Sequence, residues 1–161
     1  MNFTVFYLII GLCILWECNL LFVHRDRVKL PGEVPYRNIV MPVACILFSI
    51  FFIVRWGIGT EQFIVVGGFI VATVLYLPIK SGLMDDGVFV NGSFMPFTKM
   101  QYYAIDELGN GKIRLRAVAA RKEVSMYYAK EQEGLVGAYF EKSNVPTFEA
   151  MREQRRQARD N

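Results

Sequence analysis

The sequence predicts an integral membrane protein of mixed class: three transmembrane helices followed by a small α+β domain. The chain has 161 residues, of which 53% are hydrophobic, and 23 of its 33 charged residues lie from Ser81 onward. Apolar runs almost free of charge are typical of membrane spans, whereas the polar second half alternates as strands do. The net charge of +3 offers little attraction to a phosphate backbone, so we expect no nucleic-acid partner.

The first predicted span covers residues 3–23, in which Glu17 is the only charged side chain. A hydrocarbon core of about 30 Å requires about 20 apolar residues in a helix, and this run supplies them. A secretory signal peptide is the alternative, but no basic residue precedes the run, and the run is longer than the apolar region of such a signal. We therefore expect a retained helix rather than a cleaved leader.

Two shorter apolar runs predict the second and third spans, at residues 38–56 and 60–79. Pro42 falls in the first turn of the second run, where a missing amide costs little. Gly67 and Gly68 in the third run would permit a close approach between helices, although no strict repeat of small residues accompanies them. The membrane region as a whole is predicted to be residues 1–80.

Basic residues in the short loops predict the orientation in the membrane. The loop between the first and second spans carries Arg25, Arg27, Lys29 and Arg37, whereas the next loop carries only Arg55. Because basic loops remain in the cytoplasm, we expect the N-terminus outside and the C-terminal domain inside. The three cysteines all lie in apolar runs and imply no disulfide framework.

Glu17 and Asn19 are the polar candidates inside the first span. An ionised carboxylate at that depth is costly unless it is paired, protonated or close to the headgroups. Arg25 or Arg27 snorkelling back, or a polar group of another subunit, would relieve the cost. We favour a structural or assembly role, because a proton relay needs a second titratable group and this span contains only one acid. An ion or proton pathway is the alternative.

Residues 81–146 predict a cytoplasmic antiparallel sheet of about four strands closed by a helix. Asn91-Gly92 between two apolar runs is the hairpin signal of a type I′ turn, because both residues tolerate positive φ. Residues 112–118 and 123–129 alternate between apolar and polar side chains, so each strand is expected to bury one face.

Over about residues 130–142 the spacing of the apolar residues changes from that of a strand to that of a helix. Its apolar stripe consists of Leu135, Val136, Tyr139 and Phe140. This stripe would cover one face of the sheet. Residues 147–161 predict a short charged C-terminal helix or tail with Thr147 as its N-cap.

Two sets of basic residues are candidates for a surface that binds lipid or a partner. The strand set consists of Lys112, Arg114, Arg116, Arg121 and Lys122, and the terminal set consists of Arg152, Arg155, Arg156 and Arg159. A domain tethered beneath the membrane would place the strand set near anionic headgroups, but solvated strand residues account for it equally well. Nearby Glu149, Glu153 and Asp160 reduce the charge of the terminal set and favour an ordinary solvated helix.

The sequence carries no motif for catalysis, cofactor binding or metal binding. It has no glycine-rich phosphate loop and no Cys or His pair at metal spacing. The single histidine, His24, lies at the membrane boundary and cannot supply a catalytic triad alone. Asp85-Asp86 is better interpreted as a solvated connection than as a divalent-cation site. We therefore expect no enzyme activity, no cofactor and no metal.

The run from Gly87 to Phe97 (GVFVNGSFMPF), followed by Tyr102, Tyr103 and an Ile-Arg-Leu-Arg strand, resembles a group of small bacterial membrane proteins. These have N-terminal transmembrane helices and a C-terminal PH-like domain of unassigned function. This chain departs by having Phe97 where Trp is frequent, and by a shortened sheet that fits only a partial PH-like barrel. The resemblance covers about the latter half of the chain and implies a scaffold or sensor rather than a catalyst.

These features predict a non-enzymatic accessory or regulatory protein of the bacterial inner membrane. We expect its PH-like domain to bind a partner protein or the anionic membrane surface. The expected partners are membrane lipids and either a membrane protein or a second copy of the chain. Two alternatives belong to other classes: a membrane immunity protein against a toxin or bacteriocin, and a small transport component that uses Glu17.

Overall fold

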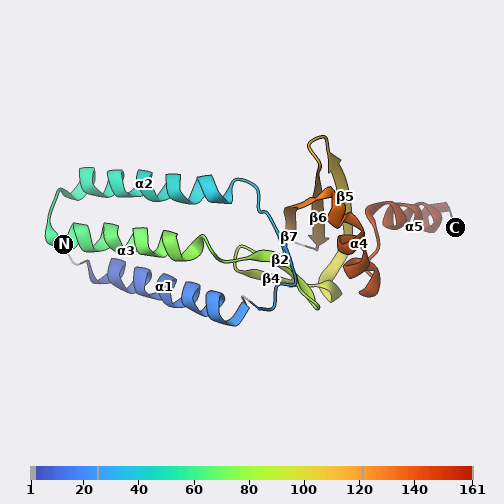
Figure 1. The fold of residues 1–161 in the computed structure, drawn as a ribbon, viewed down its shortest axis with the longest axis horizontal. Helices are drawn as coiled ribbons and strands as arrows, with labels where there is room; N and C mark the ends of the chain where they lie inside the picture. The colour runs from blue at the N-terminus through green and yellow to red at the C-terminus, as the bar shows by residue number, and fades with distance from the viewer. Residues whose placement is uncertain (1–2, 25, 121, 161) are drawn as a thin grey trace. The chain divides into compact units, whose positions relative to one another are not determined.

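The computed structural model describes residues 3–24, 26–120 and 122–160. The chain divides into two compact units (Figure 1). The helical unit comprises residues 1–25 and 36–79, and the sheet unit comprises residues 26–35 and 80–161. The fold is α+β, with apolar helices in the first unit and two antiparallel sheets in the second.

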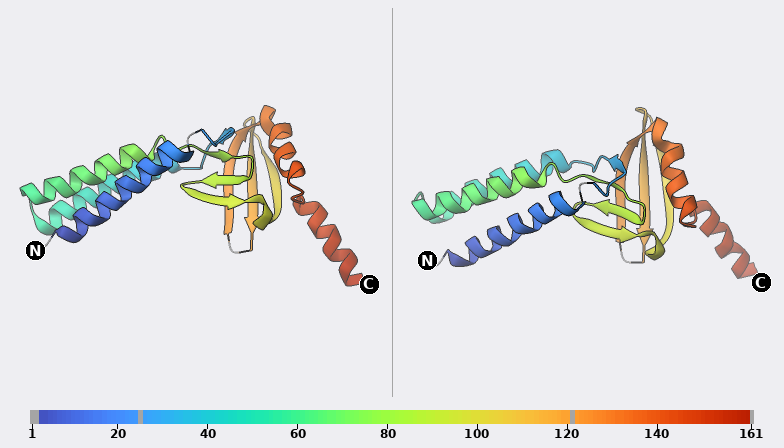
Figure 2. Two further views of the ribbon diagram at one scale, coloured as in Figure 1. Left: turned by 90° about the horizontal axis from the view of Figure 1, so that it is seen from below. Right: turned by 60° about the horizontal axis from the view of Figure 1, so that its bottom comes forward.

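The helical unit consists of α1 (Thr4–His24), α2 (Arg37–Trp56) and α3 (Thr60–Tyr76). Figures 1 and 2 show the three helices side by side. α1 and α2 are long and apolar enough to cross a membrane, whereas α3 is a shorter apolar helix of 17 residues.

The interior of the helical unit is small and aromatic. Phe52 and Val65 are fully buried, and the rings of Phe48 and Phe69 lie 4.1 Å apart. Most of the apolar side chains instead point outward. Val54, for example, is 80% exposed. The unit therefore presents a hydrocarbon surface, which favours lipid over water as its surroundings.

α1 and α3 pack closely at Gly68. A Cβ atom at this position would lie 2.7 Å from Cγ2 of Ile10, whereas a Cβ atom at Gly67 would meet nothing within 4 Å. The close approach expected from the two glycines therefore depends on Gly68 and not on Gly67. Small residues at such a contact let the two backbones come together.

Arg37 at the start of α2 binds the C-terminal end of α3. Its Nη1 donates to the carbonyl oxygen of Ile79 at 2.5 Å, and its Nη2 donates to those of Tyr76 and Leu77. The guanidinium also lies 4.5 Å from the centre of the Tyr76 ring. A cation at this end of a helix satisfies carbonyl groups that have no partner within the helix.

In the described residues, the sheet unit contains two antiparallel sheets, one of four strands and one of three. The first sheet has the order β1 (Leu30–Gly32), β2 (Ser81–Leu83), β3 (Gly87–Val90), β4 (Ser93–Pro96). The second sheet has the order β5 (Met100–Leu108), β6 (Lys112–Ala119), β7 (Lys122–Ala129). The prediction of one sheet with about four strands was wrong, because β1 and β2 are only three residues long. In addition, a 3₁₀ turn at Phe97–Lys99 separates β4 of the first sheet from β5 of the second.

The predicted hairpin and strand faces are confirmed. Asn91 and Gly92 have φ values of 51° and 79°, and they join β3 to β4 with Val90 opposite Ser93. Along β6, Ile113, Leu115 and Ala117 are buried, whereas the alternating basic residues Lys112, Arg114 and Arg116 are partly exposed. The alternating pattern thus identifies the core face of this sheet correctly.

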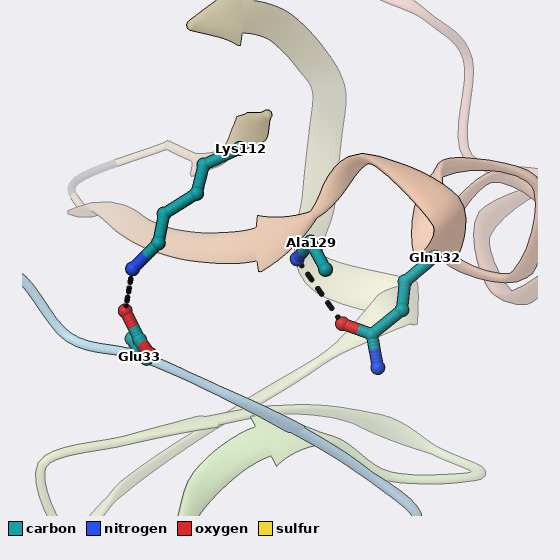
Figure 3. A network of polar contacts seen from close by, with 4 residues as sticks. All are labelled: Glu33, Lys112, Ala129 and Gln132. Carbon is teal, nitrogen blue, oxygen red and sulfur yellow. Dashed lines mark hydrogen bonds and ion pairs between the residues drawn. The ribbon is translucent and has the colours of Figure 1, made fainter. Parts of the chain in front are cut away.

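The segment before α2 joins both sheets. Besides the pairing of β1 with β2, Glu33 and Tyr127 exchange two backbone hydrogen bonds, of 2.9 and 2.8 Å. Lys112 then reaches the Glu33 carboxylate, with Nζ 2.5 Å from Oε2 (Figure 3). Residues expected to form only a loop between two spans therefore contribute a strand to the sheet unit.

Two helices follow the second sheet. A 3₁₀ turn (Lys130–Gln132) leads into α4 (Glu133–Lys142), and α5 (Phe148–Asp160) ends the chain. On α4, Val136 and Phe140 are fully buried, whereas Leu135 is 58% exposed, so the predicted apolar stripe is narrower than expected. Thr147 is confirmed as the cap of α5, because its Oγ1 accepts the Ala150 amide at 3.2 Å.

Candidate functional site

A groove of about 250 Å³ lies in the sheet unit between β5 and the first turn of α5. Its lining consists of Tyr103, Ala104, Ile105, Asp106, Arg116, Thr147, Phe148 and Glu149. The lining combines aromatic and aliphatic side chains with both signs of charge. We call this feature the β5–α5 groove.

The start of α5 is held against the edge of β5. The Tyr103 amide donates to the Pro146 carbonyl oxygen at 3.0 Å, and Tyr103 pairs with Thr147 in a single parallel bridge. The Tyr102 and Phe148 rings, 5.2 Å apart, add an aromatic contact. The connection between α4 and α5 thereby forms one wall of the groove.

Beyond Tyr103 the outer edge of β5 is open. The backbone N–H and C=O groups of alternate residues point toward the same edge of a strand. Those of Ile105 and Glu107 therefore point toward the same edge as those of Tyr103. In the described part of the chain, no backbone hydrogen bond from outside the sheet reaches Ile105 or Glu107. An exposed row of this kind is a template for an additional strand.

An ion pair between neighbouring strands lines the groove. Arg116 Nε lies 2.8 Å from Asp106 Oδ2, and Arg116 Nη2 donates to Oδ1 at 3.2 Å. The hydrogen bond to Asp106 is the main reason that the pKa of Arg116 is raised. Nearby, burial raises the pKa of Tyr103, and the Glu141 charge raises it further. The groove thus offers a fixed charge pair beside a neutral, partly buried phenol.

The structure brings most of the strand set into local contacts. Arg116 pairs with Asp106 and Lys112 pairs with Glu33. Arg114 Nη2 donates to Ser125 Oγ at 3.2 Å, and Lys122 donates to Ser93. Arg121 lies outside the described residues. Because two of these cations have carboxylate partners, the set carries less free positive charge than the sequence suggests.

The terminal set lies along α5. Arg152, Arg155 and Arg156 are exposed, and no ion pair links them to a carboxylate among the described residues. Arg159 belongs to the same helix, but its side chain is outside the described part. Arg152, Arg155 and Arg156 form an exposed surface on α5, together with the exposed Glu149 and Glu153.

The two polar candidates of the first span face different surroundings. Glu17 is only 6% exposed, and its Oε2 has no hydrogen-bond partner in the described part of the chain, whereas Asn19 is exposed. The expected partner Arg27 instead lies 3.6 Å from the Asp86 carboxylate, measured between Nη2 and Oδ2. Arg25 lies outside the described residues.

The β5–α5 groove was not anticipated from the sequence. Its wall depends on where α5 docks, and the pairing of Tyr103 with Thr147 leaves no periodic signal. The aromatic residues Tyr102, Tyr103 and Phe148 were the only available hint. Among the described residues, no group of three or more His, Cys, Asp or Glu side chains is placed to hold a metal ion.

No protein-family model matches this chain, and no curated protein or solved structure is similar to it. Its class therefore follows from its own architecture. That class is an α+β protein in which helices apolar enough to cross a membrane are joined to a unit of two antiparallel sheets.

Proposed function

We propose that the chain is a membrane-anchored adaptor of the bacterial inner membrane. The three helices span the membrane with the N-terminus outside, and the cytoplasmic sheet unit binds an extended segment of a partner protein. The observation that carries this proposal is the β5–α5 groove beside the open edge of β5 at Ile105 and Glu107. Strand addition at such an edge supplies affinity through main-chain hydrogen bonds and specificity through neighbouring side-chain pockets.

The outward-facing apolar side chains support the membrane anchor. α1 and α2 satisfy the length needed to cross the hydrocarbon region. α3 has 17 residues and rises about 26 Å at 1.5 Å per residue, so it spans a core of about 30 Å only with its flanking residues. The basic residues between α1 and α2 favour the cytoplasm for that loop.

The packing of α4 supports a PH-like architecture for the sheet unit. Val136 and Phe140 enter the core, as expected of a helix that closes a sheet domain. Phe97, at the position where Trp is frequent in the proteins resembled, packs edge-to-face on Phe140 with ring centres 5.2 Å apart. The departure from the pattern thus retains an aromatic contact between sheet and helix.

The charges of the strand set, as distinct from those of the exposed terminal set on α5, favour a protein partner over an anionic lipid surface. Attraction to anionic lipids requires cations that are free to approach the headgroups. Lys112 and Arg116 instead lie beside Glu33 and Asp106. The groove, in contrast, combines the apolar and aromatic side chains with hydrogen-bonding edges that peptide recognition uses.

Two tryptophan variants test the proposal. Ala104 on β5 lines the groove and lies opposite Arg116, and Ser125 on β7 lies opposite the same arginine on its other side. Ala104→Trp fills the groove, whereas Ser125→Trp adds similar bulk to the same sheet without entering it. The full chain, tagged at its C-terminus, is purified from native membranes in mild detergent, and its partners are quantified by mass spectrometry.

We expect a stoichiometric partner with the wild-type chain and with Ser125→Trp, and its loss with Ala104→Trp. Equal retention by both variants would exclude the groove as the binding site. A second copy of the chain as the captured partner would identify the adaptor as a homo-oligomer. Recovery of lipid alone would contradict a protein partner and would indicate that the sheet unit binds the membrane surface.

A further inference from the structure

A partly open pocket of about 160 Å³ lies among the three helices of the helical unit. Ile10 and Glu17 line it from α1, Met41 from α2, and Phe69 and Ala72 from α3. Nearly all of the lining is apolar, and Glu17 supplies the only carboxyl group. An apolar cavity of about 150 Å³ is large enough to hold benzene.

One of the two oxygens of the buried Glu17 carboxyl group lacks a hydrogen-bond partner among the described residues. The residue is 94% buried, and its Oε2 has no hydrogen-bond partner among the described residues. The nearby Thr73 hydroxyl donates to the Phe69 carbonyl at 2.9 Å and is therefore already used within α3. None of the four ion pairs in the described part of the chain includes Glu17.

A buried carboxyl group with one unpartnered oxygen, in a mostly apolar pocket, favours one kind of ligand. A cation on a small hydrocarbon body would pair with Glu17, while its body would replace the empty volume beside Ile10 and Met41. Phe69 adds an aromatic ring, which attracts a cation lying over its face. A neutral hydrocarbon would fill the cavity but leave the carboxyl group unpaired.

We propose that the cavity at Glu17 is a binding site for a small lipophilic amine, bound as its ammonium ion. The ligand class is a single aromatic or alicyclic ring that carries one amino group. If the amine enters uncharged, the Glu17 carboxyl proton moves to the amine nitrogen and leaves an ammonium–carboxylate pair. An ethanolamine phospholipid has the same cation, but its phosphate would find no donor in this apolar lining.

The experiment uses the full chain in an uncharged maltoside detergent. 4-Fluorobenzylamine is the probe, and 4-fluorotoluene is its uncharged counterpart of similar size. Binding of each is titrated by fluorine NMR. Glu17→Gln removes the charge with little change of shape, and Ala72→Leu fills the cavity without touching the carboxyl group.

We expect the amine to bind at least about tenfold more weakly to Glu17→Gln than to the wild-type chain, because a hydrogen bond to a charged group is lost. Affinity for 4-fluorotoluene should be the same in those two proteins. Ala72→Leu should abolish saturable binding of both probes. Helix content and the thermal unfolding midpoint show whether each variant remains folded.

Three outcomes would overturn the proposal: no saturable binding of the amine to the wild-type chain, equal amine affinity in Glu17→Gln, or undiminished binding in a folded Ala72→Leu. Competition by vesicle-derived ethanolamine phospholipid but not by free benzylamine would also contradict it, because the source would then be a lipid headgroup. The inference concerns the helical unit alone. It stands or fails independently of the β5–α5 groove.

Discussion

The helical unit and the sheet unit expose opposite kinds of surface. In the helical unit, Phe52 and Val65 form a small interior while side chains such as Phe22 remain 84% exposed. In the sheet unit, apolar residues such as Leu83 and Met126 are buried and charged residues face outward. Burial of apolar surface away from water governs both arrangements. The helical unit therefore exposes mainly apolar side chains, whereas the sheet unit exposes mainly polar and charged ones.

The largest expected effect distinguishes the core of the sheet unit from its surface. Phe140 is fully buried, stacks on Tyr103 with ring centres 4.3 Å apart, and contacts Phe97. Phe140→Ala should lower the free energy of unfolding of this unit by about 3–5 kcal/mol. Leu135→Ala on the exposed side of the same helix should cost about 0.5 kcal/mol or less. Urea unfolding of the full chain in detergent, followed by near-UV circular dichroism, measures both values.

The corresponding test in the helical unit uses two neighbouring glycines. Gly68→Ala places a methyl group 2.7 Å from Ile10 Cγ2, so the Ile10 side chain or the two helices must shift, and we expect a loss of about 1–3 kcal/mol. Gly67→Ala is the matched control, because a Cβ atom there meets nothing within 4 Å. Thermal unfolding of the purified full chain, detected by far-UV circular dichroism, compares them. Equal midpoints for the two variants would contradict the close packing of α1 on α3.

High pH should affect the sheet unit through a buried phenol. Burial raises the pKa of Tyr128 above its ordinary value, so the folded state favours the neutral form. Stability should be constant below pH ~10 and should fall by about 1.4 kcal/mol per pH unit above it, because the unfolded chain ionises first. Tyr128→Phe should reduce this dependence and change stability little at pH 7, since among the described residues the hydroxyl donates only to the Met126 sulfur, at 3.7 Å. If the free energy of unfolding of Tyr128→Phe fell as steeply above pH ~10 as that of the wild-type chain, a group other than Tyr128 would be responsible.

The smallest expected effect concerns backbone conformation in the loop before β6. Gly111 has a φ of 73°, whereas Gly109 does not occupy the left-handed region, and a Cβ atom would meet nothing within 4 Å at either position. Gly111→Ala should therefore cost about 1–2 kcal/mol through conformation alone. Gly109→Ala should be close to neutral. Chemical unfolding of the two variants under identical conditions provides the comparison.

Local patterns predicted those parts of the fold that local chemistry determines. Asn91-Gly92 indicated the β3–β4 hairpin, alternation indicated the faces of β6, and Thr147 indicated the start of α5. The strand at Leu30–Gly32 could not be recognised, because it is three residues long and contains Pro and Gly. Its partner in the sheet, β2, is about fifty residues away in the sequence.

The candidate sites were less predictable than the strands. Glu17 was identifiable as an acid in an apolar run, but whether it faced lipid, a headgroup or the interior depended on packing among three helices. The basic strand set was recognised by its spacing. Its carboxylate partners were not, because Glu33 and Asp106 approach it from another segment and another strand. Long-range pairing of this kind leaves no short-range signal.

The most direct test of the account is the membrane topology of the full chain. After Cys13, Cys18 and Cys45 are replaced by serine, single cysteines are placed at Ile58, between α2 and α3, and at Asn110, in the loop before β6. A membrane-impermeant maleimide is then applied to intact and to permeabilised cells. We expect Ile58→Cys to be labelled in intact cells and Asn110→Cys to be labelled only after permeabilisation. Labelling of Asn110→Cys from outside, or protection of both positions in intact cells, would contradict a three-span anchor with a cytoplasmic sheet unit.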